Sequence, residues 1–86
     1  MTYEIVWSDG AIEQLATLNG RYADAAMLVT AAVYDLADNP RPTNASRLGN
    51  SDVYRLLLGY YRVMYGVEEK TVTVQVLTVG RSDRPR

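Results

Sequence analysis

Three strand-like segments follow one another closely in the second half of the chain, and they constrain its fold more than any other feature. Residues 53–58, 60–67 and 71–80 are rich in β-branched and aromatic side chains. The turns between them, at Gly59 and at residues 68–70, are too short to hold a helix. Because parallel neighbours need a long crossover connection, these segments predict an antiparallel meander.

The first forty residues predict one strand followed by two helices. Residues 3–7 have the pattern of a short strand. Ser8 is a suitable N-cap for a helix that ends at Asn19-Gly20 and places three apolar residues at helical spacing: Ile12, Leu15 and Leu18.

The second helix has a continuous apolar stripe and is terminated by Asn39-Pro40. The stripe has steps of four and three residues and consists of Tyr22, Ala26, Val29, Val33 and Leu36. Residues 39–50 are rich in turn formers and predict a loop.

Together these elements predict an α+β fold in the order β-α-α-β-β-β, with two helices packed on one face of a small antiparallel sheet. A chain of 86 residues is long enough for one core only, so we expect a single domain over residues 1–86. A hydrophobic content of 48% excludes a disordered chain.

The charge is divided unevenly along the chain, although the formal net charge is only −1. Residues 1–40 carry six acidic residues and one base, Arg21, whereas residues 41–86 carry eight bases and four acidic residues. The predicted sheet is therefore basic and the predicted helical half is acidic.

The absence of cysteine and histidine narrows the chemistry. Without cysteine the chain has no disulfides or thiolate metal sites, which suits a reducing cytoplasm. Without histidine it lacks the usual general base and the usual zinc ligand. No signal segment or membrane-spanning run is evident, so we expect a cytoplasmic protein without a membrane partner.

Strand alternation predicts which side chains the helices leave uncovered. Residues 61, 63, 65 and 67 are expected to face the helices, as are 72, 74 and 76. The open face is then expected to carry Arg55, Arg62 and Arg81, with Tyr60 and Gln75 nearby, and apolar residues that include Leu57 and Val79.

Three guanidinium groups and an aromatic ring on one rigid face are suited to bind the phosphates and bases of single-stranded RNA. Arg47 and Arg84 can add to the same positive field. The alternative is that these arginines are the ordinary polar surface of a half-buried sheet.

Several segments in this order resemble the RelE/ParE toxin superfamily. They are Asn39-Pro40-Arg41-Pro42, Arg47-Leu48-Gly49, Val53-Tyr54-Arg55, the block from Gly59 to Tyr65 (G-x-Y-R-V-x-Y), and Val76-Leu77-Thr78-Val79-Gly80-Arg81. The resemblance covers nearly the whole chain and implies a toxin encoded beside its antitoxin.

The resemblance implies two possible targets. Members similar to RelE cleave messenger RNA in the ribosomal A site, using the 2′-hydroxyl of the RNA and no metal or other cofactor. In that case Arg62 matches the arginine that stabilises the transition state, and Arg55 and Arg81 match further basic positions of the site. Members similar to ParE poison DNA gyrase instead.

Three departures from the family pattern leave a third possibility open, a domain that only binds its antitoxin. Leu57 stands where the family has a second lysine, Ser82 replaces one of two bases after the glycine, and the C-terminal tyrosine has no counterpart. All three possibilities share the antitoxin, the product of an adjacent gene, as a partner. Leu57, Met64, Leu77 and Val79 are expected to give it apolar anchors.

Overall fold

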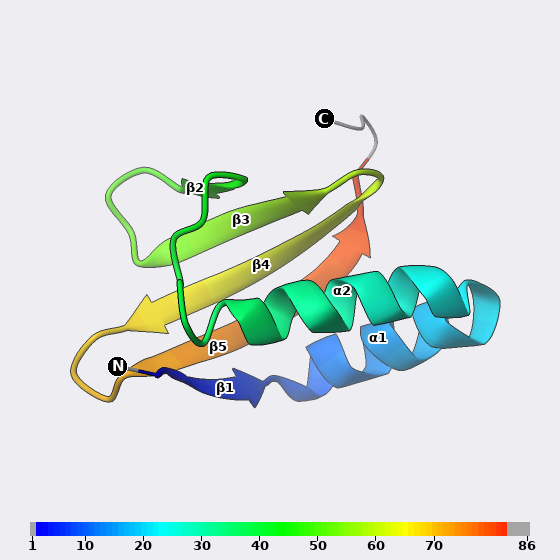
Figure 1. Ribbon diagram of the computed structural model, residues 1–86, viewed down its shortest axis with the longest axis horizontal. Helices are drawn as coiled ribbons and strands as arrows, with labels where there is room; N and C mark the ends of the chain where they lie inside the picture. Colours follow the sequence, from blue (N-terminus) through cyan, green and yellow to red (C-terminus); the bar gives the residue numbers. More distant parts are fainter. Residues whose placement is uncertain (1, 83–86) are drawn as a thin grey trace.

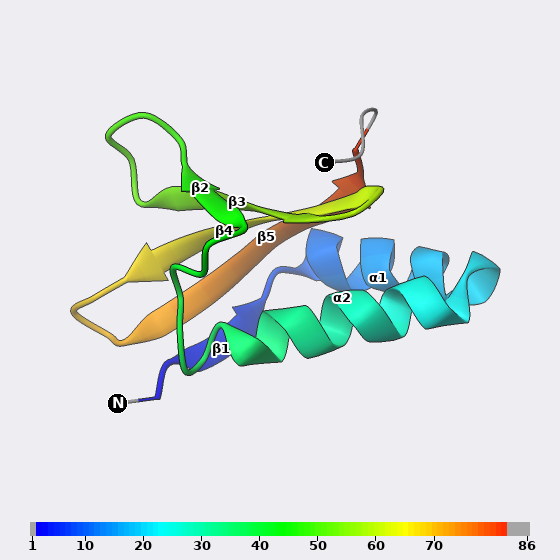
Figure 2. The ribbon, with the colours of Figure 1, turned by 45° about the horizontal axis from the view of Figure 1, so that its top comes forward.

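The computed structural model describes residues 2–82 as one five-stranded sheet with two helices packed against one face (Figures 1 and 2). The strand order is β1-β5-β4-β3-β2. The elements are β1 (Glu4–Trp7), α1 (Asp9–Arg21), α2 (Ala23–Asp35), β2 (Ala45–Arg47), β3 (Val53–Leu58), β4 (Tyr61–Glu68) and β5 (Thr73–Arg81).

This architecture confirms the expected fold class. β3, β4 and β5 form the antiparallel meander, and β1 pairs with β5 in parallel, with both helices and the other three strands between them in sequence. One strand was missed: β2 lies inside the segment predicted as a loop and pairs with β3 at the edge of the sheet.

The first helix begins as predicted but ends later. Ser8 is its N-cap, with the side-chain oxygen accepting a hydrogen bond from the backbone N–H of Ala11 at 3.0 Å. Gly20 lowers helix stability without ending the helix, which continues to Arg21. The break is the single residue Tyr22, which ends α1 and precedes α2.

The apolar stripe of the second helix is confirmed except at Tyr22. Ala26, Val29, Val33 and Leu36 are buried, whereas the Tyr22 side chain is exposed because this residue forms the bend between the helices. In α1 the buried position is Ala11, and Ile12, one of the three apolar residues at helical spacing, is exposed.

The largest fully buried side chain of the core is that of Tyr65 on β4. Its ring stacks on that of Tyr54, with centroids 5.7 Å apart. Its hydroxyl donates a 2.7 Å hydrogen bond to the carbonyl of buried Pro40, and so fixes the start of the segment that leads to β2. Burial raises the pKa of this phenol to about 12.

A polar cluster joins four segments at the opposite end of the sheet from the β3–β4 turn. Arg41 forms a 3.0 Å ion pair with Glu69 and donates from Nε to the Tyr54 hydroxyl at 2.8 Å. The Tyr3 hydroxyl donates to the Glu69 carboxylate at 2.8 Å. The hydrogen bond from Tyr3, and then the one from Arg41, hold the pKa of Glu69 below its ordinary value.

Where β1 ends, side chains form hydrogen bonds with the backbone along the outer edge of β5. β1 pairs with β5 only as far as Val76. Beyond it, the Leu77 carbonyl accepts a 2.8 Å hydrogen bond from the Ser8 hydroxyl, and the Val79 N–H donates to the Gln14 side-chain carbonyl at 2.7 Å. Side chains of the α1 N-cap and of α1 itself therefore provide hydrogen-bond partners for the backbone groups of β5 that β1 does not reach.

We predict that Tyr65→Phe lowers the free energy of unfolding by about 1–3 kcal/mol, because it leaves the buried Pro40 carbonyl without its donor. Urea unfolding measures this value. Tyr34→Phe, which changes an exposed tyrosine, is the control and should stay within about 0.5 kcal/mol of wild type. Equal stability of the Tyr65 and Tyr34 variants would contradict the prediction.

We predict that Gln14→Leu destabilises the protein by about 1 kcal/mol, because the Val79 N–H loses its acceptor. Gln14→Glu keeps an acceptor oxygen and should retain most of the stability. Hydrogen exchange at the Val79 amide reports on the same bond and should accelerate only in the leucine variant. Faster exchange in both variants would show that the bond requires the amide group.

We predict that acid stability depends on Glu69. Because its folded pKa lies below the ordinary value of 4.5, the carboxylate contributes stability above that pH, and the contribution is lost as the pH falls through the folded pKa. Glu69→Gln should therefore flatten the decline in melting temperature below about pH 4.5. Glu68→Gln controls for the change in net charge, and the same decline in the Glu69 variant as in wild type would rule out this contribution.

Candidate functional site

An extra residue in β5 changes which of its side chains face the helices. Met64 pairs with Thr78 and Tyr65 pairs with Val76, so Leu77 has no partner of its own in the ladder and forms a bulge. Beyond the bulge the alternation is reversed, and Val79 lies buried in the core. The expectation that Val79 lies on the open face is therefore wrong.

The same bulge moves Arg81 away from the predicted arginine cluster. Arg81 pairs with Tyr61, a residue of the helix-facing set, and lines a pocket between α1 and the end of β5. The prediction that Arg55, Arg62 and Arg81 share one uncovered face is thus wrong for Arg81. The open face keeps two of the three arginines.

Two adjacent rows of the sheet form the open face around these arginines. In one row Arg55 lies between Ser46 on β2 and Met64 on β4, and Thr78 follows on β5. In the next row Arg62 lies between Leu57 and Gly80. The two guanidinium side chains are diagonal neighbours, with hydroxyl groups at both ends of the first row. None of the residues in these two rows has a carboxylate or an imidazole that could accept a proton.

Arg62 is held in place by the neighbouring strand. Its guanidinium lies over Gly80, where an added Cβ would be 3.7 Å from the Arg62 Cζ, and its Nη1 donates to the Arg81 carbonyl at 2.8 Å. A guanidinium has five N–H donors, so this bond leaves capacity for a phosphate group. The arrangement orients Arg62 before any ligand binds.

The other predicted site residues lie apart from this pair. Tyr60 is in the β3–β4 turn, where strand alternation does not apply, and its ring lies 5.6 Å from the Arg81 guanidinium. Gln75 is on the open face but pairs with Gly66, about 16 Å along β5 from Gly80. Arg47 donates to the carbonyls of Ser51 and Asn50, at 2.7 and 3.1 Å, and so braces its own loop. Arg84 lies outside the described residues.

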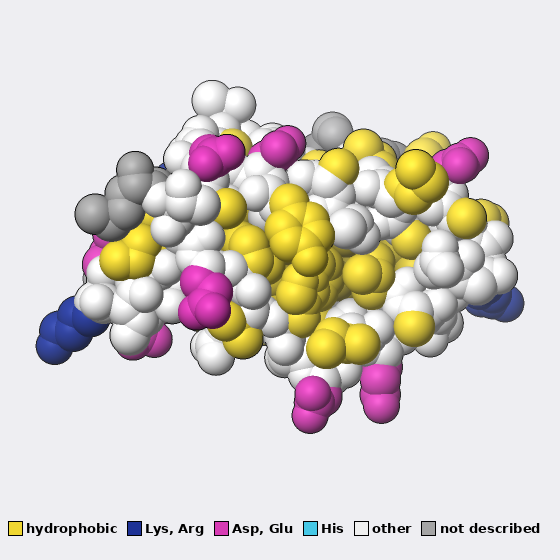
Figure 3. Space-filling view, turned by 60° about the horizontal axis from the view of Figure 1, so that its bottom comes forward, with side chains coloured by type: hydrophobic (Ala, Val, Ile, Leu, Met, Phe, Trp, Pro, Cys, Tyr) yellow, Lys and Arg dark blue, Asp and Glu magenta, His cyan; other side chains and the backbone are white. Residues whose placement is uncertain are grey.

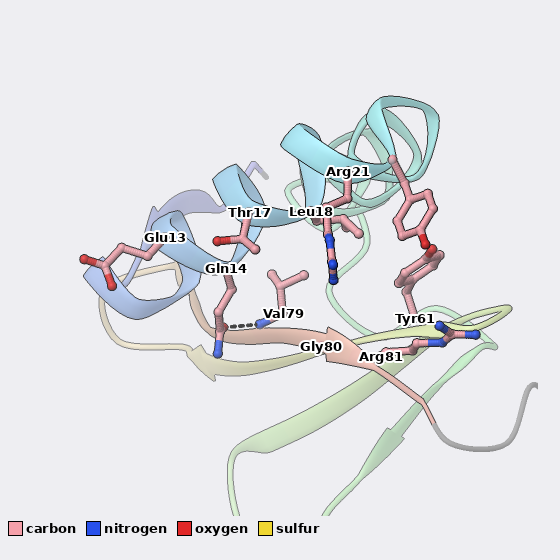
Figure 4. A pocket seen from close by; sticks show the side chains of 10 residues that line it. Glu13, Gln14, Thr17, Leu18, Arg21, Tyr61, Val79, Gly80 and Arg81 are labelled. Atoms are coloured by element: carbon pink, nitrogen blue, oxygen red, sulfur yellow. Dashed lines mark hydrogen bonds between the residues drawn. The ribbon is translucent and has the colours of Figure 1, made fainter.

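The pocket that contains Arg81 was not predicted. It has a volume of about 480 Å³ and lies between α1 and the last residues of β5 (Figure 4). Arg21 extends from α1 toward the sheet in this pocket, and Tyr61 forms part of its wall. One sequence feature could have indicated this pocket: Arg21 is the only basic residue among the six acidic residues of positions 1–40.

A second hollow follows the outer surface of the helical hairpin. It has a volume of about 580 Å³ and is lined mainly by apolar residues, among them Ile12, Leu15 and Met27. Figure 3 shows hydrophobic side chains gathered near the middle of one face of the molecule, with acidic side chains around them. Met27 and Leu28 are largely exposed on the surface of α2.

Within residues 2–82, no group of three or more acidic side chains gathers in a way that could hold a metal ion. None of the helices in that range has the length and apolar character needed to cross a membrane.

The family comparison identifies a match along almost the whole chain. Residues 5–85 match the model described as the ParE toxin of the type II toxin–antitoxin system, parDE. None of the curated proteins gives a significant match.

Solved toxin structures share the fold at low sequence identity. The isolated Escherichia coli RelE toxin has a TM-score of 0.81 and 22% identity, over 98% of this chain and 88% of that one. The RelBE2 toxin–antitoxin complex of Mycobacterium tuberculosis gives 0.80 and 20%, over 94% and 92%. The chromosomal ParDE system of Pseudomonas aeruginosa gives 0.75 and 18%, over 95% and 98%.

The meander backed by a helical hairpin is thus shared with these toxins, and the family model extends over nearly every residue. This chain belongs to the RelE/ParE superfamily of toxins from type II toxin–antitoxin systems.

Proposed function

We propose that this toxin cleaves messenger RNA on the ribosome, with Arg62 and Arg55 as its phosphate-binding residues. The observation that carries the proposal is the open sheet face, where two neighbouring guanidinium groups lie in adjacent rows and Arg62 is fixed by the Arg81 carbonyl. Such groups bind phosphate oxygens in the geometry that single-stranded RNA presents.

In this proposal the RNA supplies its own nucleophile. The 2′-hydroxyl attacks the adjacent phosphorus, the P–O5′ bond breaks, and a 2′,3′-cyclic phosphate and a 5′-hydroxyl end form. Arg62 stabilises the extra negative charge on the phosphate in the transition state, and Arg55 binds the RNA beside that phosphate. Since the two rows of the open face hold no proton acceptor, proton transfer is assigned to the RNA, the ribosome or solvent.

A specific observation favours a second candidate, a toxin that poisons DNA gyrase without cutting RNA. The matching family model is that of ParE toxins, and the predicted three-arginine cluster is reduced to two. Leu57, directly beside Arg62 in the ladder, adds an apolar side chain where a lysine would assist phosphate binding. A face of this composition is suited to bind a protein surface as well as RNA.

For either target we propose that a cognate antitoxin binds and neutralises the toxin. Solved complexes of RelE with RelB and a ParDE system support such a partner for this chain. The apolar hollow between α1 and α2 supports docking of an amphipathic segment, because it places exposed side chains such as Met27 and Ile12 along a single groove. The third possibility, a domain that keeps only this binding, predicts no effect on growth.

We predict that Arg62→Ala abolishes growth arrest on induced expression and lowers the rate of mRNA cleavage by about 100-fold or more, because the transition-state charge loses its main donor. Mapping of RNA 5′ ends after induction measures cleavage, and an assay of gyrase–DNA cleavage complexes runs in parallel. Lys70→Ala removes a cation from the exposed β4–β5 turn, so it serves as the matched control and should remain toxic. Circular dichroism checks that both variants fold.

Each pattern of results separates the candidates. Toxicity that survives Arg62→Ala excludes the proposed mechanism. DNA cleavage complexes without new RNA ends identify gyrase as the target. Wild-type expression that leaves growth, RNA and gyrase unaffected leaves antitoxin binding as the remaining role.

A further inference from the structure

The pocket between α1 and the end of β5 brings together two arginines that are sixty residues apart in sequence. Arg21 lies in the last turn of α1, and Arg81 is the last residue of β5. Both line the pocket of about 480 Å³, together with Tyr61 (Figure 4). Tyr22 also lines it. This pocket is on the helix side of the sheet, so it is separate from the Arg55–Arg62 face.

The two arginines are available to an anion. Within residues 2–82 the Arg21 guanidinium has no hydrogen-bond or ion-pair partner, and that of Arg81 lies against the ring of Tyr60, 5.6 Å from its centroid. Glu13 also lines the pocket, but Figure 4 shows its carboxylate directed away from Arg21. Two like charges that share a pocket repel each other, and an anion bound between them removes that repulsion.

The surroundings of the pocket select the class of anion. α1, which borders the pocket, carries Asp9 and Glu13, and α2, the other helix of the same layer, carries Asp24 and Asp35. These carboxylates repel an extended polyanion such as RNA or DNA. The walls of the pocket include the apolar side chains of Leu18 and Val79. A single carboxylate next to an apolar group suits both the acidic surroundings, which disfavour a polyanion, and the apolar walls.

We propose that this pocket binds an acidic side chain of a partner peptide, with the adjacent apolar residue of the peptide packed against Tyr61 and Leu18. The carboxylate accepts charge-assisted hydrogen bonds from Arg21 and Arg81. The inference rests on the proposed antitoxin partnership, because it specifies a contact that such a partner makes outside the hollow between α1 and α2.

The test is an NMR titration of the full chain with blocked dipeptides, and it requires no toxicity. N-acetyl-Glu-Leu-amide is expected to shift the amide signals of Val79 and Gly80 and the Nε–H signals of Arg21 and Arg81. N-acetyl-Gln-Leu-amide, which has the same shape without the charge, should bind about tenfold more weakly. Arg21→Gln and Arg81→Gln should each remove this preference, and Arg55→Gln, which removes a guanidinium from the opposite face, should keep it.

Four outcomes would overturn the proposal. They are equal binding of the two dipeptides, shifts confined to the open sheet face, retention of the charge preference in folded Arg21→Gln protein, and tighter binding of a uridine tetranucleotide at this pocket than of the acidic dipeptide. Because binding is measured directly, a failure here leaves the growth and RNA-end results unchanged, and a failure of the proposed target leaves this titration interpretable.

Discussion

The single extra residue at Leu77 determines how this protein divides its functional groups between the two faces of the sheet. Before the bulge, β5 contributes Val74 and Val76 to the core; after it, Val79 does so, and Arg81 follows on the same side. Without the bulge, Val79 would be exposed and Arg81 would join Arg55 and Arg62. Instead, Gly80 faces the open side, and the Arg62 guanidinium lies over it, 3.7 Å from where a Cβ would stand. The bulge thus both removes one arginine from the open face and positions another.

This arrangement places most of the acidic residues and the Arg55–Arg62 pair on different surfaces of the protein. The open face combines Arg55 and Arg62 with hydroxyl and apolar groups, whereas the helical layer is acidic and borders, through α1, the pocket that contains Arg21 and Arg81. A long polyanion is attracted to the first surface and repelled from most of the second. One small domain can therefore present separate surfaces to a target and to a partner protein.

Most of the fold could be predicted from the sequence, because strong periodicity identified both helices and the three strands of the meander. β2 was missed because three residues that include a serine and an arginine are too few to produce a recognisable strand pattern. The orientation of Arg81 was missed for a different reason: Leu77 and Val79 are both apolar, so the sequence is equally compatible with an unbroken strand and with a bulge. The predicted face of the sheet was therefore right for residues before that point, such as Arg62, and wrong for Val79 and Arg81 after it.

The edges of the sheet have a consequence for how other molecules can attach. The outer strands are short, with four residues in β1 and three in β2, and the part of β5 that extends past β1 is capped by the side chains of Ser8, Gln14 and Arg62. Little unpaired backbone is left as a template on which a further strand could be added, which limits aggregation through edge-to-edge pairing. Recognition of this protein is thereby directed to its side-chain surfaces, where a single substitution can separate one binding partner from another.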